Sequence, residues 1–289
     1  MQRLVRIASL LLFLVATLAA AQTTTEAPPH FTVATPVANM YRTASIDADV
    51  VSQAIFSIDV VLLESAESWS KVLTADQYTG WISTAELVRG TYPSGKTAIV
   101  SSLFASLYRE PDVEKHRPLI TVPFESRLEI SGEKQIKDEK WFSVRLPDGV
   151  PAWVQSGDVV FDEKRLSIAE AIALAKRFLG LPYRWGGTSS WGYDCSGFMQ
   201  MLVHSRGALM PRDASVQAKW DGLVPVERTA LQPGDLLYFG KDQKVNHTAM
   251  YIGGGEFIHA TRQDHPYVQV SHLDDEPWTT RFITARRLK

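Results

Sequence analysis

The stretch that decides the fold is Trp191–Phe198, which reads WGYDCSGF and carries Cys195, the one cysteine among 289 residues. In an oxidising compartment thiols usually pair, so a lone cysteine is either buried and inert or kept for reactivity. Asp194 is a candidate N-cap, and the apolar residues after Cys195 predict a helix that ends at Gly207. The thiol would lie in the first helical turn, where unpaired N–H groups and the helix dipole favour the thiolate.

Two histidines further along could supply the base that such a thiol needs. Residues 245–261 predict a hairpin that turns at Gly253-Gly254-Gly255. A three-residue loop makes His247 and His259 diagonal neighbours on one face, whereas a two-residue loop would separate them. We expect the cysteine helix to pack across this face, with His247 as base and His259 as the group that orients it. A zinc site built from Cys195 and the two histidines is the alternative.

A change of pattern marks the start of this C-terminal domain, which we place at residues 165–289. Ser167 and Glu170 have the spacing of a capping box, and apolar residues then recur with a helical period. Gly180, followed by Pro182, ends this helix.

The residues before this domain contain an internal repeat. Five residues recur after 72 positions: Glu67, Trp69, Val72, Trp81 and Val88 return as Glu139, Trp141, Val144, Trp153 and Val160. Short β-branched and aromatic runs between turn signals predict two small all-β barrels, at residues 33–90 and 96–161. We expect the tryptophans to be core residues and Tyr78 to lie at the surface.

The N-terminus has the features of an export signal. Arg3 and Arg6 precede the apolar run Ile7–Ala21, which is short for a bilayer span and ends in small residues. Residues 1–21 are therefore interpreted as a signal peptide, and 22–32 as a flexible linker. With no cysteine near the cleavage point, we expect no membrane anchor and a periplasmic or secreted protein.

The composition is that of a globular protein. Hydrophobic residues make up 45% of the chain and the formal net charge is −2, which is enough apolar material for two or three packed domains. Without a Lys/Arg block, the sequence argues against nucleic-acid binding and against an electrostatic membrane anchor.

The two all-β units resemble bacterial SH3-type modules. The likeness is carried by Asn39–Arg42, Trp69–Val72 and Gly80–Ile82, while the second unit has Ala152 where glycine is usual. In that family such modules bind cell-wall peptide or position an attached enzyme.

From Leu166 to Lys289 the chain resembles the NlpC/p60 family of papain-like cysteine peptidases. The motifs that carry this likeness occur in the family's order and spacing: Leu181–Gly187, Asp194–Phe198, Pro211–Gln217, Leu231–Leu236, Asn246–Tyr251 and Phe257–Ala260. The resemblance implies an α+β fold, in which a papain-like peptidase domain follows two SH3-like barrels. It also implies cleavage of peptidoglycan stem peptides after a γ-linked D-glutamate, with no cofactor and no metal.

Carried over by position, the family's catalytic residues are four in this chain. Cys195 is the nucleophile, His247 the base and His259 the third polar residue, while Tyr183 lies beside the oxyanion. The backbone N–H of Cys195, at a helix N-terminus, would be the other oxyanion donor.

The resemblance also implies contacts with the substrate. Asp213 and Ser196 match positions that bind the free amine of the substrate's first residue. Asp194 is either a helix cap or a further substrate contact. If the first barrel packs over the cleft, with Tyr78 as its contact, only short peptides such as L-Ala-γ-D-Glu-diamino acid would enter.

Two other functions stay open at this point. One is a wall-binding or activating protein whose peptidase domain is a spent scaffold, against which the intact Cys195, His247 and His259 argue. The other is acyl transfer to an amine or lipid by the same thiol chemistry.

Overall fold

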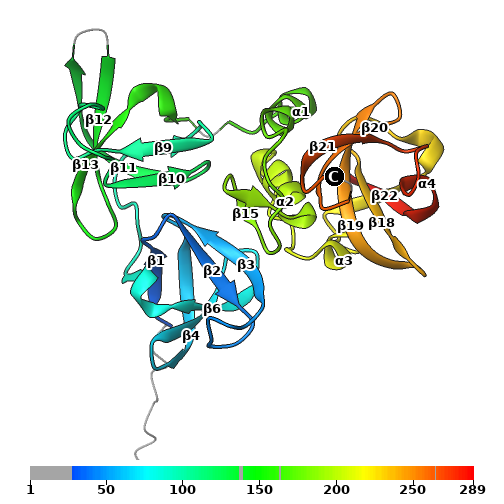
Figure 1. Ribbon diagram of the computed structural model, residues 1–289, viewed down its shortest axis with the longest axis horizontal. Coiled ribbons are helices and arrows are strands. Elements are labelled where there is room, and N and C mark those ends of the chain that lie inside the picture. The colour runs from blue at the N-terminus through cyan, green and yellow to red at the C-terminus, as the bar shows by residue number, and fades with distance from the viewer. Residues whose placement is uncertain (1–27, 137–138, 163, 264) are drawn as a thin grey trace, which may run out of the picture.

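Figure 1 shows the chain, a computed structural model, as three units in series: two all-β units and then a domain of helices and strands. The structure describes residues 28–136, 139–162, 164–263 and 265–289. The predicted signal peptide and the predicted linker before residue 28 lie outside the described residues. No helix within the described ranges is long and apolar enough to cross a membrane.

The first unit, module 1, is a seven-stranded antiparallel sheet in the order β3-β2-β6-β5-β4-β1-β7. Its elements are β1 (His30–Val33), β2 (Val37–Tyr41), β3 (Val50–Ile55), β4 (Asp59–Ala66), β5 (Trp69–Leu73), β6 (Thr79–Ser83), the 3₁₀ turn η1 (Thr84–Glu86) and β7 (Leu87–Arg89). Strand β1 pairs with both β4 and β7, so the fold begins at His30, inside the predicted linker. Its core includes Val33, Met40 and Ile82, which are fully buried.

The second unit, module 2, combines a five-stranded sheet in the order β13-β12-β11-β8-β14 with a two-stranded ribbon, β10-β9. Its elements are β8 (Thr97–Val100), β9 (Phe104–Leu107), β10 (Ile120–Pro123), β11 (Arg127–Ile136), β12 (Glu139–Arg145), β13 (Pro151–Gln155), the 3₁₀ turn η2 (Ser156–Asp158) and β14 (Val159–Val160). Its core includes Val100, Leu128 and Val144, and Phe56 of module 1 is buried in the same cluster.

The internal repeat has a structural counterpart in the two modules. Equivalent contacts are the edge-to-face ring pairs Tyr41–Trp69 and Tyr108–Trp141, at 5.3 and 5.7 Å, and the cross-strand pairs Lys71–Trp81 and Ser143–Trp153. The expectation that all these tryptophans are core residues is wrong, because only Trp141 is fully buried. Most of the interior of both modules is filled by other apolar side chains, such as Met40 and Ile82 in module 1 and Leu128 and Phe142 in module 2.

The C-terminal domain packs helices against an antiparallel sheet in the order β17-β22-β18-β19-β20-β21. Its elements are α1 (Ile168–Arg177), β15 (Thr188–Ser189), β16 (Gly192–Tyr193), α2 (Cys195–Ser205), α3 (Ala214–Gln217), β17 (Leu223–Val226), η3 (Arg228–Ala230), β18 (Leu236–Lys241), β19 (Lys244–Gly253), β20 (Glu256–Thr261), β21 (Tyr267–His272), α4 (Trp278–Arg281) and β22 (Phe282–Leu288). The predicted capping box of Ser167 and Glu170 is confirmed at the start of α1.

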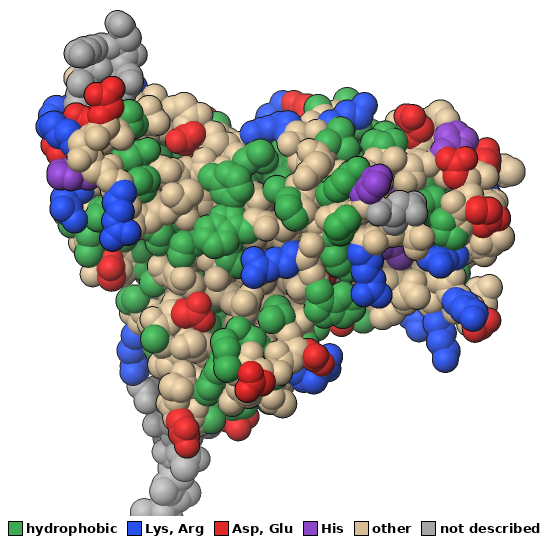
Figure 2. All heavy atoms as spheres, in the orientation of Figure 1, with side chains coloured by type: hydrophobic (Ala, Val, Ile, Leu, Met, Phe, Trp, Pro, Cys, Tyr) green, Lys and Arg blue, Asp and Glu red, His purple; other side chains and the backbone are tan. Residues whose placement is uncertain are grey.

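Both modules contact the C-terminal domain. Phe124 of module 2 is buried in the core of that domain, where its ring lies 5.5 Å from that of Phe178. Its backbone N–H donates to Ser190 Oγ at 3.1 Å, and the Ser190 hydroxyl donates to the Leu103 carbonyl at 2.6 Å. On the face drawn in Figure 2, hydrophobic side chains gather over the middle of the molecule, and most charged side chains lie toward its outer ends.

Candidate active site

Cys195 is the first residue of α2, and its thiol is free and buried. Asp194 caps the helix as predicted, because its side chain accepts a hydrogen bond from the Gly197 N–H at 2.7 Å. Gly197 is required for space: a Cβ atom there would lie 2.1 Å from the Gly187 carbonyl oxygen. The first turn of α2 is thus held against the turn at Gly186-Gly187.

The hairpin brings the two histidines onto one face by a route the sequence does not predict. Strands β19 and β20 pair at Met250–Ile258 and then shift register at a bulge before Gly253–Glu256. The turn therefore contains two residues, Gly254 and Gly255, both with positive φ. The bulge supplies the extra residue, so the register expected from a three-residue loop is kept.

His247 and His259 are hydrogen-bonded to each other. The Nε2 atom of His247 lies 2.7 Å from Nδ1 of His259, and Nε2 of His259 lies 3.1 Å from the Ser271 hydroxyl. If His259 donates to Ser271 and accepts from His247, the Nδ1 atom of His247 carries the lone pair. The sequence analysis does not find Ser271. This residue lies on β21 and pairs with Phe257 of β20, which is two residues before His259, so Ser271 and His259 share a sheet face.

The expectation that α2 packs across the histidine face is wrong. The apolar side chains of α2, such as Phe198 and Leu202, pack against the opposite face of the sheet. The imidazoles instead contact an aromatic group, in which the ring of Trp278 lies 5.1 Å from that of His247 and 4.8 Å from that of His259. The N-terminus of α2 lies near β19 at Thr248, the residue after His247, where the Thr248 backbone N–H lowers the pKa of the Cys195 thiol.

Burial keeps the imidazoles neutral. It lowers the pKa of His247 to about 3, with a further lowering by the nearby Arg281, and it holds the pKa of His259 well below its usual range. A neutral His247 can accept a proton.

The thiol is also neutral in the resting site, contrary to the prediction of a lowered pKa. Burial raises the pKa of Cys195 to about 12, and the Asp194 carboxylate raises it further. The N–H groups of Thr248 and Ser196 and the cation of Arg212 oppose this without cancelling it. Desolvation of the charged form therefore outweighs the helix N-terminus.

Tyr183 lies close enough to Cys195 and Asp194 for both to act on the pKa of its hydroxyl. Its backbone N–H donates to the Pro266 carbonyl at 2.7 Å, and its side chain is half-buried. Burial, together with the neighbouring Cys195 and Asp194, raises the pKa of its hydroxyl. The hydroxyl therefore stays protonated and able to donate.

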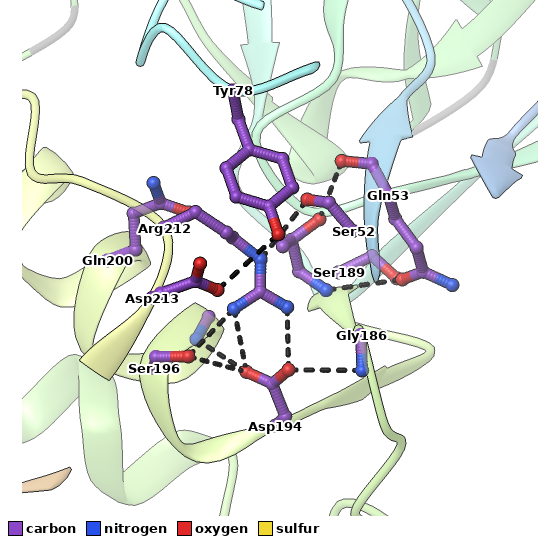
Figure 3. Close-up of polar contacts among 12 residues, drawn as sticks. Ser52, Gln53, Tyr78, Gly186, Ser189, Asp194, Ser196, Gln200, Arg212 and Asp213 are labelled. Carbon is purple, nitrogen blue, oxygen red and sulfur yellow. Dashed lines mark hydrogen bonds and ion pairs between the residues drawn. The ribbon is translucent and has the colours of Figure 1, made fainter. Parts of the chain in front are cut away.

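Module 1 borders the site at α2, as Figure 3 shows. Tyr78, expected at the surface, is half-buried, and its hydroxyl lies 3.5 Å from Asp213 Oδ1. The Asp213 side chain is exposed, whereas Asp194 and Ser196 are buried and bonded to Arg212.

The zinc alternative finds no support in the geometry. Among the residues that the structure describes, no three His, Cys, Asp or Glu side chains are grouped so as to hold a metal ion. Within the histidine pair, the nitrogen atoms that face each other are bonded to each other.

The fold and the site define a cysteine peptidase with a papain-like architecture. The NlpC/P60 family matches residues 180–287, and a bacterial dipeptidyl-peptidase SH3 domain matches residues 40–87. A gamma-D-glutamyl-L-lysine dipeptidyl-peptidase of Bacillus cereus is 34% identical over 256 residues, which cover 82% of this chain and 74% of that protein. The chain belongs to the NlpC/P60 family.

Two further relatives agree with this assignment. A gamma-D-glutamyl-L-lysine dipeptidyl-peptidase of Bacillus subtilis is 30% identical over 254 residues, which cover 83% of this chain and 82% of that protein. The crystal structure of an NlpC/P60 family protein from Bacillus cereus superposes with a TM-score of 0.77 at 28% identity, and the match covers 90% of this chain and 99% of that one.

Proposed function

We propose that this protein is an exported endopeptidase that hydrolyses the bond between γ-D-glutamate and a diamino acid in short peptides released from peptidoglycan. The proposal depends on one observation: two hydrogen bonds link His247 to His259 and His259 to Ser271, beside a cysteine at a helix N-terminus. The names of the relatives support the γ-D-glutamyl specificity. Their similarity also supports action outside the cytoplasm, on cell-wall material.

The chemistry begins with neutral partners. As Cys195 Sγ attacks the γ-carbonyl carbon, its proton passes to Nδ1 of His247, and the imidazolium that forms is stabilised through His259. The developing oxyanion accepts hydrogen bonds from the Cys195 backbone N–H and the Tyr183 hydroxyl.

Two bond-breaking steps complete the cycle. Collapse of the tetrahedral intermediate breaks the amide bond, and His247 gives its proton to the amine of the leaving diamino acid. A water molecule then attacks the thioester and gives a proton to His247, which returns it to the Cys195 sulfur as the acid fragment leaves.

Module 1 supports the restriction to short peptides. The Tyr78 hydroxyl of module 1 contacts Asp213 of the C-terminal domain. This pair lies next to Ser196, a residue of the first turn of α2 (Figure 3). A free ammonium group can donate to the exposed Asp213 carboxylate and to the Tyr78 hydroxyl at once, whereas a glycan-linked stem peptide has no charge there and would meet module 1. Asp194 is fully engaged by the helix cap and by Arg212, so we assign the amine to Asp213 and Tyr78 in preference to it. The Ser196 hydroxyl accepts from Arg212 and donates to Asp194, which leaves it one lone pair for the amine.

The test compares two peptides of equal length. Wild-type protein should cleave L-Ala-γ-D-Glu-L-Lys to L-Ala-γ-D-Glu and lysine, detected by mass spectrometry, and should cleave the N-acetylated peptide about 10²-fold more slowly or worse. Cys195→Ala should cleave neither. The Asp213→Asn variant should lose most of the preference for the free peptide over the N-acetylated peptide.

Each failure has its own meaning in this test. Equal rates on the two peptides would overturn the proposed amine recognition. No cleavage of either peptide by wild-type protein would overturn the proposed reaction.

A further inference from the structure

Arg212 is a buried cation that joins module 1 to the start of the cysteine helix (Figure 3). Its side chain is only 2% exposed, and all three of its nitrogen atoms are bonded. Nη1 and Nη2 donate to the two Asp194 oxygen atoms at 3.0 and 2.6 Å, and Nη1 also donates to Ser196 Oγ at 2.8 Å. Nε donates to the hydroxyl of Ser52, a residue of module 1, at 3.1 Å.

We propose that Arg212 is a positioning residue that makes the reactivity of Cys195 depend on the docking of module 1. The four residues Arg212, Asp194, Ser196 and Ser52 form what we call the clamp. The inference rests on the proposed function, in which Cys195 is the nucleophile.

Arg212 fixes the orientation of the helix cap. The Asp194 carboxylate also accepts from the Gly186 and Gly197 N–H groups, at 3.0 and 2.7 Å, so it links the cap to the neighbouring turn. A planar guanidinium that pairs through two parallel bonds fixes the plane of the carboxylate as well as its distance. The orientation of the first turn of α2, and with it of Cys195, is therefore set by Arg212.

Module 1 in turn holds Arg212 in place. Ser52 lies on β3, and the next residue, Gln53, accepts two hydrogen bonds from Thr188: one from its hydroxyl at 3.1 Å and one from its backbone N–H at 3.2 Å. A second contact lies further along α2, where Gln200 Nε2 donates to Asp76 at 2.7 Å. Because β3 is anchored on β15, the position of the Ser52 hydroxyl is fixed relative to the cysteine helix.

Arg212 also changes the net charge beside the thiol. An Asp194 carboxylate next to Cys195 disfavours a second anion, and the Arg212 cation offsets it. The groups that face the thiol, or that flank these two charges, are Asp194, Arg212, Asp213, Tyr183, His247 and the N–H groups of Ser196 and Thr248. Arg212 is the buried cation among them.

The experiment reads the thiol directly and does not depend on turnover. The rate of Cys195 alkylation by iodoacetamide is measured at rising pH, from pH ~8 to the highest pH at which the protein stays folded, because burial raises the pKa of this thiol to about 12. The pH midpoint of reactivity is obtained by fitting the rates to a single ionisation, and peptide cleavage is measured in parallel. Arg212→Gln should move the midpoint to higher pH and lower kcat about 10²-fold. Arg212→Lys keeps a cation, so its midpoint should stay near that of wild type, while kcat falls because the two-bond pairing is lost.

Two further variants separate charge from docking. Arg212→Gln combined with Asp194→Asn removes both charges but keeps a good helix cap, so the midpoint should return toward that of wild type. Ser52→Ala removes only the hydrogen bond between Arg212 and module 1, so it should lower kcat/KM several-fold without moving the midpoint.

The matched control is another two-bond Arg–Asp pair in the same domain. Arg287 donates to Asp235 at 2.6 and 2.8 Å, at the start of β18 and away from Cys195. Arg287→Gln should lower the melting temperature without moving the alkylation midpoint.

Specific outcomes would overturn the inference. They are a folded Arg212→Gln or Arg212→Lys variant with wild-type kcat, a folded Ser52→Ala variant with wild-type kcat/KM, or an Arg287→Gln variant whose midpoint moves as far as that of Arg212→Gln. If the midpoints behave as expected but wild-type protein cleaves no peptide, the proposed function fails while the clamp stands.

Discussion

His247 and His259 form a direct imidazole–imidazole hydrogen bond of 2.7 Å inside an aromatic pocket that includes Trp278. The orienting group is therefore neutral, where many triads use a carboxylate. A neutral imidazole fixes the tautomer of His247 without adding a negative charge that would raise its basicity, and burial lowers the pKa of His247 to about 3.

The first prediction concerns this relay. His259→Ala should lower kcat about 10²-fold or more, because His247 loses both its orientation and the partner of its cation. Ser271→Ala acts one bond further away, so its effect should be about 10-fold or less. A larger loss in Ser271→Ala than in His259→Ala, measured by steady-state kinetics on folded proteins, would contradict the relay.

The second prediction concerns the protonation of the thiol. A cysteine whose pKa is raised holds its proton as the pH rises, and burial raises that of Cys195 to about 12. The difference in absorbance at 240 nm between wild type and Cys195→Ser should therefore show no thiolate at pH 7 and none up to pH 9. A full thiolate signal at pH 7 would mean that a cysteine–histidine ion pair is the resting state.

The third prediction concerns Tyr183. Its hydroxyl has a raised pKa and stays protonated, so it can donate to the oxyanion through the alkaline range. Tyr183→Phe should lower kcat about 10²-fold or more with little change in KM, since the lost bond belongs to the transition state. A change confined to KM would assign Tyr183 to substrate binding instead.

The fourth prediction concerns the close approach at Gly197. Its missing side chain leaves room for the Gly187 carbonyl, which a Cβ atom would approach to 2.1 Å. Gly197→Ala should displace the start of α2, lower the melting temperature and abolish activity. Gly157→Ala is the matched control, because a Cβ atom there has nothing within 4 Å.

Local signals in the sequence predict much of this structure. The repeat predicts two similar modules because the same Trp-to-Trp spacing produces the same cross-strand pairs. The polar residue before Cys195 and the spacing of Ser167 and Glu170 predict helix starts, since caps are made between neighbours in the chain.

What the sequence does not predict depends on contacts between distant segments. The pKa of the thiol follows its burial, which depends on the complete fold. The local rule that a helix N-terminus lowers the pKa of a thiol therefore predicts the wrong direction here. Ser271 and Trp278 belong to the histidine pocket only because β21 and α4 fold back beside β20. The bulge before Gly253 cannot be distinguished from a longer loop by counting glycines.

The insertion of Phe124 into the core of the C-terminal domain bears on how such an enzyme can be taken apart or recombined. A catalytic fragment cut free at residue 165 would lose a phenylalanine from its own interior, a deficit of ~3–5 kcal/mol by comparison with large-to-small substitutions in cores. That is a large part of the stability of an ordinary domain. Module 2 therefore completes the core of the C-terminal domain, although it is a separate unit in the sequence. A gene fusion that replaces module 2 with an unrelated barrel would have to supply an aromatic side chain at the position of Phe124.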